Sequence, residues 1–256
     1  MILTDTHTHL YANQFDEDRK EMISKCFEED ITRLFLPNID SSSIEGMMKL
    51  ASDYPENCFP MMGLHPTSVK DNFREELILI ENLMTLSDFC AVGEIGIDLY
   101  WDKSFLKQQQ EAFRFQIELA KKHKLPFVIH CRDAFDEIFE ILDELNDDSM
   151  RGIFHCFTGT IEQANHIINY GDFKIGIGGV VTFKNSGLDK VVEQIDLKHL
   201  VLETDSPYLA PTPFRGKRNE STYLYTIAEK VAEVKKVSVE ELAKITTQNS
   251  KQVFGF

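Results

Sequence analysis

The chain has 256 residues, of which 43% are hydrophobic and 27% charged, and 27 basic side chains face 42 acidic ones for a formal net charge of −15. This composition is typical of a globular protein and excludes a largely disordered chain, and the apolar runs are too short for a membrane span. The excess of acid argues against a broad basic surface that coats nucleic acid, although bound metal ions can make a small site locally positive.

The cysteines and the first residues indicate the compartment. No basic patch followed by an apolar core opens the chain, so no secretory signal is visible. The five cysteines are odd in number and form no C-x-x-C pair, which fits neither a disulfide framework nor a cysteine zinc site. We therefore expect a cytoplasmic protein that contacts no membrane and needs no obligate protein partner.

Short apolar runs alternate with longer amphipathic runs along the whole chain, and no linker divides it, so we predict a single domain over residues 1–256. Buried parallel strands are predicted at Ile2–Thr6, Arg33–Pro37, Cys58–Leu64, Phe89–Ile95, Pro126–His130, Gly152–Phe157, Lys174–Gly178 and Leu200–Thr204. Helices are predicted between them, for example at Asp16–Glu29, Asn72–Leu86, Ser104–Lys122, Asp133–Asn146 and Thr160–Tyr170. Helix N-caps are predicted at Asp133, Thr160 and Ser238, the last with Glu241 as a capping box.

Eight strands that alternate with helices at intervals of about 25–35 residues predict an α/β fold of the (β/α)₈ TIM-barrel type. An open doubly wound sheet is the alternative. It is disfavoured because eight strand–helix units nearly exhaust the chain, and because no glycine-rich phosphate-binding motif follows the first strand.

Histidines and acids gather at the carboxyl ends of the predicted strands. In a barrel these ends meet in one pocket, where the active site lies. His7 and His9 are two residues apart, so both rings point to the same face of an extended chain. Imidazoles that converge inside a barrel need a partner, and a divalent metal ion is the usual one. For this pair alone, solvated histidines at a strand end are the alternative.

Glu94 stands inside an apolar strand, where an unpaired carboxylate is costly to bury. Because a carboxylate has two oxygens, it can bridge two cations. The expected ligands of two divalent ions are His7, His9, Glu94 and Asp205 for one ion and Glu94, His130 and His155 for the other. Zn²⁺, Mg²⁺ and Mn²⁺ each accept mixed imidazole and carboxylate ligands. The alternative, unrelated hydrogen-bonded polar groups of the core, is disfavoured for the set as a whole.

Glu94 and Asp205 are also the candidate catalytic residues. A carboxylate that binds a metal ion through one oxygen keeps the other free, so we expect Asp205 to be the base for a water that attacks near Glu94. His65 follows the third predicted strand on the same face. Since the ligand sets are already complete, we expect His65 to contact the substrate.

Six segments carry these residues in a specific order: Thr6-His7-Thr8-His9-Leu10, Gly63-Leu64-His65-Pro66, Val92-Gly93-Glu94-Ile95-Gly96-Ile97-Asp98, Ile129-His130-Cys131-Arg132-Asp133-Ala134, Phe154-His155-Cys156-Phe157-Thr158-Gly159 and Leu202-Glu203-Thr204-Asp205-Ser206-Pro207. Together they resemble the TatD family of metal-dependent deoxyribonucleases, over essentially the whole chain. The resemblance implies a barrel, a two-metal site and phosphodiester hydrolysis on DNA. It also implies that the metal ligands are His7, His9, Glu94, His130, His155 and Asp205.

The charges near this site predict how a DNA strand is held. Two divalent ions together with the negative charges of Glu94 and Asp205 would give the site a net charge of about +2. Residues 206–219 contain no acid and add three cations, and Arg132 follows a strand on the same face. The expected substrate-binding residues are therefore His65, Arg132, Arg215, Lys217 and Arg218. A positive pocket in an acidic protein suits exonucleolytic cleavage of a single strand or strand end better than the coating of a duplex.

Two other classes of function stay open. A hydrolase of amide or ester bonds, acting on a cyclic amide or an aminoacyl-tRNA, would use much the same metal ions, and the basic loop only weakly favours phosphate. A non-catalytic binding module would tolerate the six ligand residues but has no need for a complete site.

Overall fold

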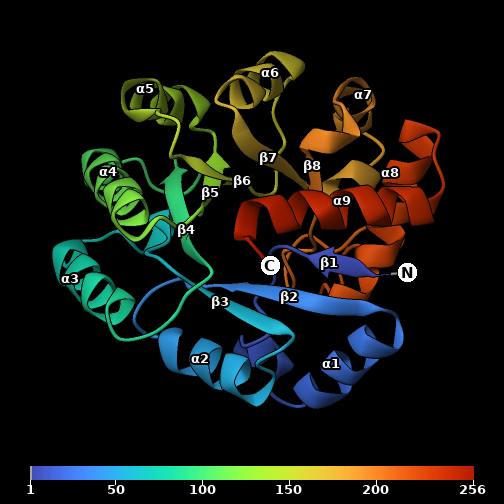
Figure 1. Ribbon diagram of the computed structural model, residues 1–256, viewed down its shortest axis with the longest axis horizontal. Helices are drawn as coiled ribbons and strands as arrows, with labels where there is room; N and C mark the ends of the chain where they lie inside the picture. The colour runs from blue at the N-terminus through green and yellow to red at the C-terminus, as the bar shows by residue number, and fades with distance from the viewer. Residues whose placement is uncertain (1) are drawn as a thin grey trace.

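Eight parallel strands pair in chain order, from β1 with β2 through β7 with β8, in the computed structural model, which describes residues 2–256 (Figure 1). The strands are β1 (Leu3–Asp5), β2 (Ile31–Pro37), β3 (Cys58–Met62), β4 (Ala91–Asp98), β5 (Phe127–Arg132), β6 (Arg151–Phe154), β7 (Asp172–Ile177) and β8 (Leu200–Leu202). Every predicted strand is present, with ends that differ by at most three residues. The predicted TIM barrel is confirmed as a nearly closed one.

Helices surround the strands as an outer layer, except for α9, which lies across one end of the barrel (Figure 1). They are α1 (Arg19–Glu28), α2 (Ile44–Asp53), α3 (Phe73–Met84), α4 (Leu106–His123), α5 (Phe135–Leu145), α6 (Ile161–Asn169), α7 (Leu188–Gln194), α8 (Leu224–Lys235) and α9 (Val239–Phe254). None of the helices in the described part of the chain is long and apolar enough to cross a membrane.

The predicted helix caps are confirmed at two positions and wrong at the third. Thr160 begins α6 with a reciprocal capping box, and Ser238 accepts a hydrogen bond from the backbone of Glu241 at the start of α9. Asp133 does not cap α5, because β5 continues through Arg132 and the chain then turns at Asp133 with a φ of 53°. The helix therefore begins at Phe135, without a side-chain cap.

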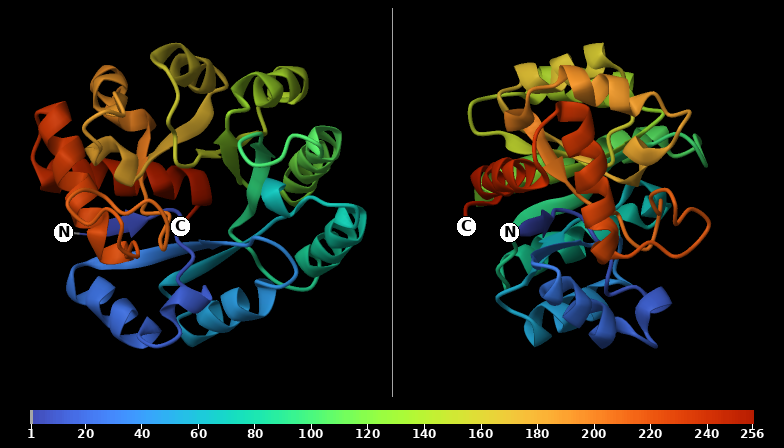
Figure 2. Two further views of the ribbon diagram at one scale, coloured as in Figure 1. Left: turned by 180° about the vertical axis from the view of Figure 1, so that it is seen from behind. Right: turned by 90° about the vertical axis from the view of Figure 1, so that its right-hand side faces the viewer.

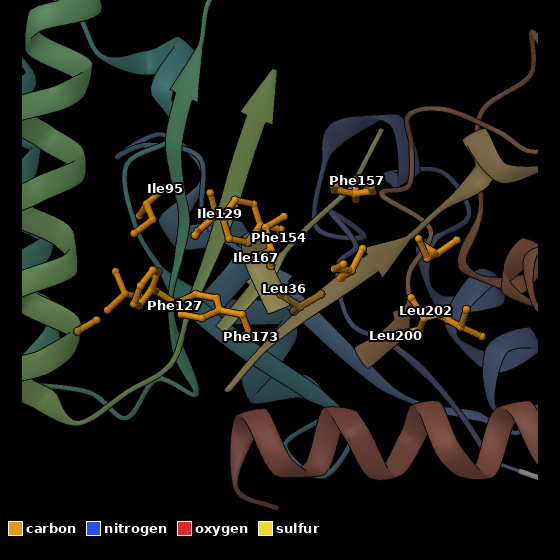
Figure 3. Packing of buried hydrophobic residues seen from close by; sticks show 14 of the residues in the cluster. Leu36, Ile95, Phe127, Ile129, Phe154, Phe157, Ile167, Phe173, Leu200 and Leu202 are labelled. Carbon is orange, nitrogen blue, oxygen red and sulfur yellow. The ribbon is translucent and has the colours of Figure 1, made fainter. Parts of the chain in front are cut away.

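Successive strand residues point alternately outward to the helices and inward to the barrel axis. Phe127 and Ile129 of β5 pack outward in the main core, which Figure 3 shows between strands and helices. Val128 between them packs inward. The inward cluster consists of Phe35, Met61, Ala91, Val128, Ile153, Val201 and Val253. This apolar filling occupies the part of the barrel next to α9.

Helix α9 closes the amino-terminal end of the barrel. Val253 packs on the inward cluster, and the ring of Phe254 stacks on Phe35 with centroids 4.0 Å apart. Arg151, at the start of β6, donates to the carbonyl of Val253 at 3.1 Å. Figure 2 shows α9 and the loop after β8 on opposite sides of the molecule. One end of the barrel is thus plugged, and polar residues at the other end have room to form a site.

Asp5 joins β1 to β8. Among the described residues, these two strands are not paired by a ladder of hydrogen bonds, whereas all other adjacent strands of the barrel are. The fully buried carboxylate of Asp5 accepts hydrogen bonds from the backbone and hydroxyl of Thr204 at 2.9 and 2.6 Å and from the backbone of His7 at 3.3 Å. Three backbone hydrogen bonds also cross this seam: Thr6 N–H to Leu202, Asp205 N–H to His7 and His9 N–H to Ser206.

We expect Asp5→Ala to lower the free energy of unfolding by about 2–4 kcal/mol, because buried donors of Thr204 lose their acceptor. Urea denaturation measures this change. Asp53→Ala is the matched control: Asp53 is exposed and forms a surface ion pair with Lys49 at 2.7 Å, so its loss should cost less than about 1 kcal/mol. Equal stability of the two variants would contradict a stabilising role of Asp5 in the seam.

Candidate metal centre

The six residues predicted as metal ligands meet at the carboxyl-terminal end of the barrel. His7 and His9 follow β1, Glu94 lies within β4, and His130 within β5. The remaining two are His155, directly after β6, and Asp205, three residues after β8. Apart from His130, which is partly buried, all are buried. The order of the strands therefore brings the six residues together at one end of the barrel, although the first and last of them lie almost 200 residues apart in the chain.

Glu94 divides its two carboxylate oxygens between two groups of side chains. Oε2 lies 3.1 Å from His7 Nε2 and 3.7 Å from His9 Nε2. Oε1 lies 2.6 Å from His155 Nε2 and 2.9 Å from His130 Nδ1. Oδ1 of the remaining acid, Asp205, is 3.6 Å from Nε2 of both His7 and His9, so it belongs to the first group.

Backbone contacts with the neighbouring strands hold Glu94 in place. Asn38, directly after β2, accepts from Glu94 N–H at 3.2 Å and donates its own N–H to Gly93 at 3.1 Å. Its side-chain amide donates to the Gly63 carbonyl after β3 at 2.8 Å. The pairing of β4 with β5 shifts register between Val92 and Ile95, on either side of this contact. Three strands thus determine where the carboxylate lies.

Hydrogen bonds behind two of the histidines set which ring nitrogen faces the site. Tyr11 donates its hydroxyl to the Pro37 carbonyl at 2.5 Å, so at 2.8 Å it accepts from His9 Nδ1. His130 Nε2 lies 2.8 Å from Asp98 Oδ2, which accepts its proton. When either ring is neutral, its other nitrogen carries the lone pair and faces the site, as in histidines that bind metal ions.

Glu203 lies behind His155 as an ion-pair partner, although His155 Nδ1 has no hydrogen-bond partner among the described residues. Its fully buried carboxylate accepts the backbone N–H of Cys156 and lies 3.4 Å from His155 Nδ1, while its Oε2 has no hydrogen-bond partner among the described residues. Gly176 in β7 makes room for this side chain, since a Cβ there would overlap the Glu203 carboxylate.

The residues behind the histidines, Tyr11, Asp98 and Glu203, are not among the predicted site residues, although each carries a signal in the sequence. Asp98 lies four residues after Glu94 in the same strand, so alternation places both on one face. Glu203 directly follows the apolar strand β8, so it is an acid in an apolar setting, like Glu94 in β4. Tyr11 lies two residues after His9, the same spacing as between His7 and His9. The sequence does not show which histidine each of these residues contacts, because only the distance to a ring nitrogen identifies the partner.

His65 differs from the other histidines of the site. Its Nδ1 accepts the backbone N–H of Thr67 at 3.1 Å, so in the neutral ring the proton lies on Nε2. That nitrogen is 3.3 Å from Glu94 Oε1. Although Nε2 lies close enough to Glu94 and His130 to complete a group of potential ligands, it presents an N–H there and not a lone pair.

The carboxylates and histidines of the cluster shift one another's pKa. Burial raises the pKa of Glu94, but the surrounding histidines, His155, His65 and His7 foremost, hold that pKa well below its ordinary value. Burial lowers the pKa of His155, yet Glu94 and Glu203 hold it well above its ordinary value. The site therefore favours positive charge next to its carboxylates.

The donor atoms fit divalent metal ions. Both ring nitrogens of His7 are buried without a hydrogen-bond partner among the described residues. Two groups of three ligand atoms that lie within 4.8 Å of one another contain His7: His7 with His9 and Glu94, and His7 with His155 and Glu203. Lone pairs of imidazole and carboxylate that face one another need a cation between them, and Zn²⁺, Mn²⁺ and Mg²⁺ all bind such ligands.

A pocket of about 720 Å³ opens above the cluster, lined by residues that include Glu94, Asp205, His65 and Arg132. Arg132 is exposed and makes no ion pair with any described residue. Two of the predicted substrate contacts, His65 after β3 and Arg132 at the end of β5, thus line the pocket beside the predicted metal ligands.

The three cations of the loop after β8 lie elsewhere, since none of them is among the described residues that line this pocket. Arg215 and Lys217 are exposed, and the Arg215 guanidinium lies 4.0 Å from the centroid of the Phe183 ring. Arg218 pairs with Asp18 at 2.6 Å and with Glu220 at 3.1 Å, so its charge is compensated by contacts that attach the loop to the start of α1.

Comparison with known proteins identifies the family. A family model described as TatD related DNase matches residues 4–255. The chain is 41% identical over 254 residues to the uncharacterized metal-dependent hydrolase YabD of Bacillus subtilis, with 99% of each chain covered. It is 30% identical over 257 residues to the 3'-5' ssDNA/RNA exonuclease TatD of Pantoea ananatis, with 98% of each covered.

The fold comparison leads to the same family. The crystal structure of YJJV, a TatD homologue from Escherichia coli K12, matches with a TM-score of 0.93 and 26% identity, and covers 99% of this chain and 98% of that one. The resemblance that the sequence motifs carry is therefore confirmed. The chain belongs to the TatD family of metal-dependent hydrolases.

Proposed function

We propose that this protein hydrolyses phosphodiester bonds of DNA, releasing nucleotides from the ends of single strands with the help of two divalent ions. The division of the Glu94 oxygens between two ligand groups, on the floor of an open pocket, carries the proposal. The family description and the name of the Pantoea ananatis relative support the choice of nucleic acid as substrate.

The chain offers a complete set of ligands to each ion. His7, His9 and Asp205 would hold one ion together with Glu94 Oε2, and His130 and His155 would hold the other together with Glu94 Oε1. When bound, such ions neutralise a phosphate, stabilise the leaving oxygen and lower the pKa of water.

Asp205 is the proposed base that accepts the proton of the attacking water. Its side chain is 13% exposed, against 3% for Glu94, so it is the acid of the pair that a water in the pocket can reach. One oxygen, Oδ1, faces His7 and His9, which leaves Oδ2 to accept a proton. Its backbone N–H donates to the His7 carbonyl at 2.9 Å and keeps the carboxylate at the site.

The pocket also has groups that suit a phosphodiester. The unpaired guanidinium of Arg132 can contact a phosphate oxygen, and His65 lines the same pocket as a second proposed substrate contact. A volume of about 720 Å³ is that of a small-molecule pocket, so it suits a strand end more than a duplex. A local positive charge in the pocket would allow a polyanionic substrate to bind although the whole chain has a net charge of −15.

Metal content tests the bridging role of Glu94. Glu94→Ala is expected to lose both ions together, because each ion loses one carboxylate oxygen, whereas His155→Ala should lose mainly one. Elemental analysis after dialysis gives the number of ions bound per chain. His166→Ala is the matched control, since His166 lies in α6 and pairs with Asp143 on the surface. Equal metal loss in Glu94→Ala and His155→Ala would contradict the bridge.

Turnover tests both the reaction and the base. The metal-loaded protein is expected to degrade single strands labelled at the 3′ end. Asp205→Asn should lower kcat about 10²-fold or more at full metal occupancy, because it keeps one oxygen ligand but cannot accept the proton. Hydrolysis of a cyclic amide or an aminoacyl-tRNA without cleavage of DNA would overturn the proposed function, and normal turnover by Asp205→Asn would exclude this residue as the base.

The basic loop after β8 is proposed to contact backbone phosphates beyond the scissile one. Replacement of Arg215 and Lys217 by alanine should raise KM for an oligonucleotide and flatten its salt dependence, because such contacts release counterions. On a nitrophenyl ester with a single phosphodiester, kcat/KM should stay unchanged. Arg218 is left intact because it pairs with Asp18. Equal losses on both substrates would contradict a role limited to distant phosphates.

A further inference from the structure

The rim of the pocket carries an aromatic surface that the metal chemistry does not use. Trp101, the only tryptophan of the chain, is 73% exposed and lines the same pocket as Glu94 and Asp205. Its neighbour Tyr100 is 53% exposed. Large aromatic side chains contribute most when they are buried, so an indole left in water beside a site has no explanation in the packing of the core.

This aromatic surface has a defined geometry. The rings of Tyr100 and Trp101 meet edge to face, with centroids 4.8 Å apart and an interplanar angle of 90°. The Arg132 guanidinium, at the end of β5, lies 3.7 Å from the centroid of Tyr100 and 5.5 Å from that of Trp101. Contacts of this type between a cation and ring faces are attractive, so the rings and the charge support one another.

The chemistry of these groups selects one class of ligand. A flat indole stacks on flat rings of any identity, and an unpaired guanidinium beside it contacts an anion. The ligand that offers an aromatic ring next to a phosphate is a nucleotide unit whose base is unpaired. Inside a duplex both faces of each base are covered by its neighbours, and only the outer face of the terminal base pair is free.

We propose that Trp101 stacks on a nucleobase adjacent to the scissile phosphodiester, while Arg132 contacts the strand's phosphate. This inference rests on the proposed nuclease function and deepens it: the enzyme would select unpaired strand ends that carry bases, with little preference among the bases. Stacking would occur on the β4–β5 side of the pocket. Tyr208 and Leu209 of the segment after β8 line the same pocket from the other side of the barrel.

Because Trp101 is the only tryptophan, its fluorescence reports this contact without labelling. The metal-loaded protein is mixed with a short oligothymidylate in a stopped-flow instrument, and fluorescence is recorded before the first turnover ends. The matched ligand has the same phosphates but abasic end residues. Saturable quenching by the base-bearing strand, with none by the abasic strand, is the expected result. Equal quenching by both strands, or quenching by neither, would overturn the stacking contact.

Steady-state kinetics supply an independent test. Trp101→Leu keeps apolar area but loses the stacking face, and is expected to raise KM for the base-bearing strand about 10-fold. Trp101→Phe should restore most of the affinity, and both variants should degrade the abasic strand as the wild type does. Tyr225→Ala on α8 is the matched control, an aromatic residue that is 37% exposed and does not line the pocket.

The outcomes separate this inference from the proposed function. If wild-type protein degrades single strands and Trp101→Leu does so with an unchanged KM, the stacking inference is wrong and the nuclease function stands. Equal losses on base-bearing and abasic strands would also overturn stacking, because they would indicate a change in the shape of the site. If wild-type protein cleaves neither strand, the proposed function itself fails.

Discussion

A single buried carboxylate, that of Glu94, is the constraint on which the site depends. Its side chain is only 3% exposed, and a negative charge so placed is stable only when positive charge or hydrogen-bond donors surround it. Five histidines, from four different strand ends, bring a nitrogen within 3.7 Å of its oxygens. Tyr11 and Asp98 orient two of these rings by hydrogen bonds, and Glu203 pairs with a third, so a second layer of polar side chains surrounds the first.

The barrel supports this polar end because its other end is apolar and closed. Along β5 the inward positions change from Val128 to His130, and along β6 from Ile153 to His155. Phe254 of α9 stacks on Phe35 of the apolar layer, so the ligands lie above a buried apolar base. The fold therefore confines polar chemistry to the carboxyl-terminal end of the barrel, as is usual for barrel enzymes.

Charged side chains of the same type have different roles here because their partners differ. Arg218 is neutralised by Asp18 and Glu220 and holds a loop in place, while Arg132 rests on aromatic rings and keeps its charge available at the pocket. Net charge alone, −15 for the whole chain, says little about the charge that a ligand meets at the site.

The sequence by itself determined the order of strands and helices and the ligand-type residues at the strand ends, because hydrophobic periodicity and strand polarity are local properties. It did not determine the cap of α5, since the turn at Asp133 depends on how far β5 extends along its neighbour. Nor did it separate Arg132 from Arg218 or pair His155 with Glu203. These distinctions rest on distances between residues far apart in the chain, and only the packed barrel decides them.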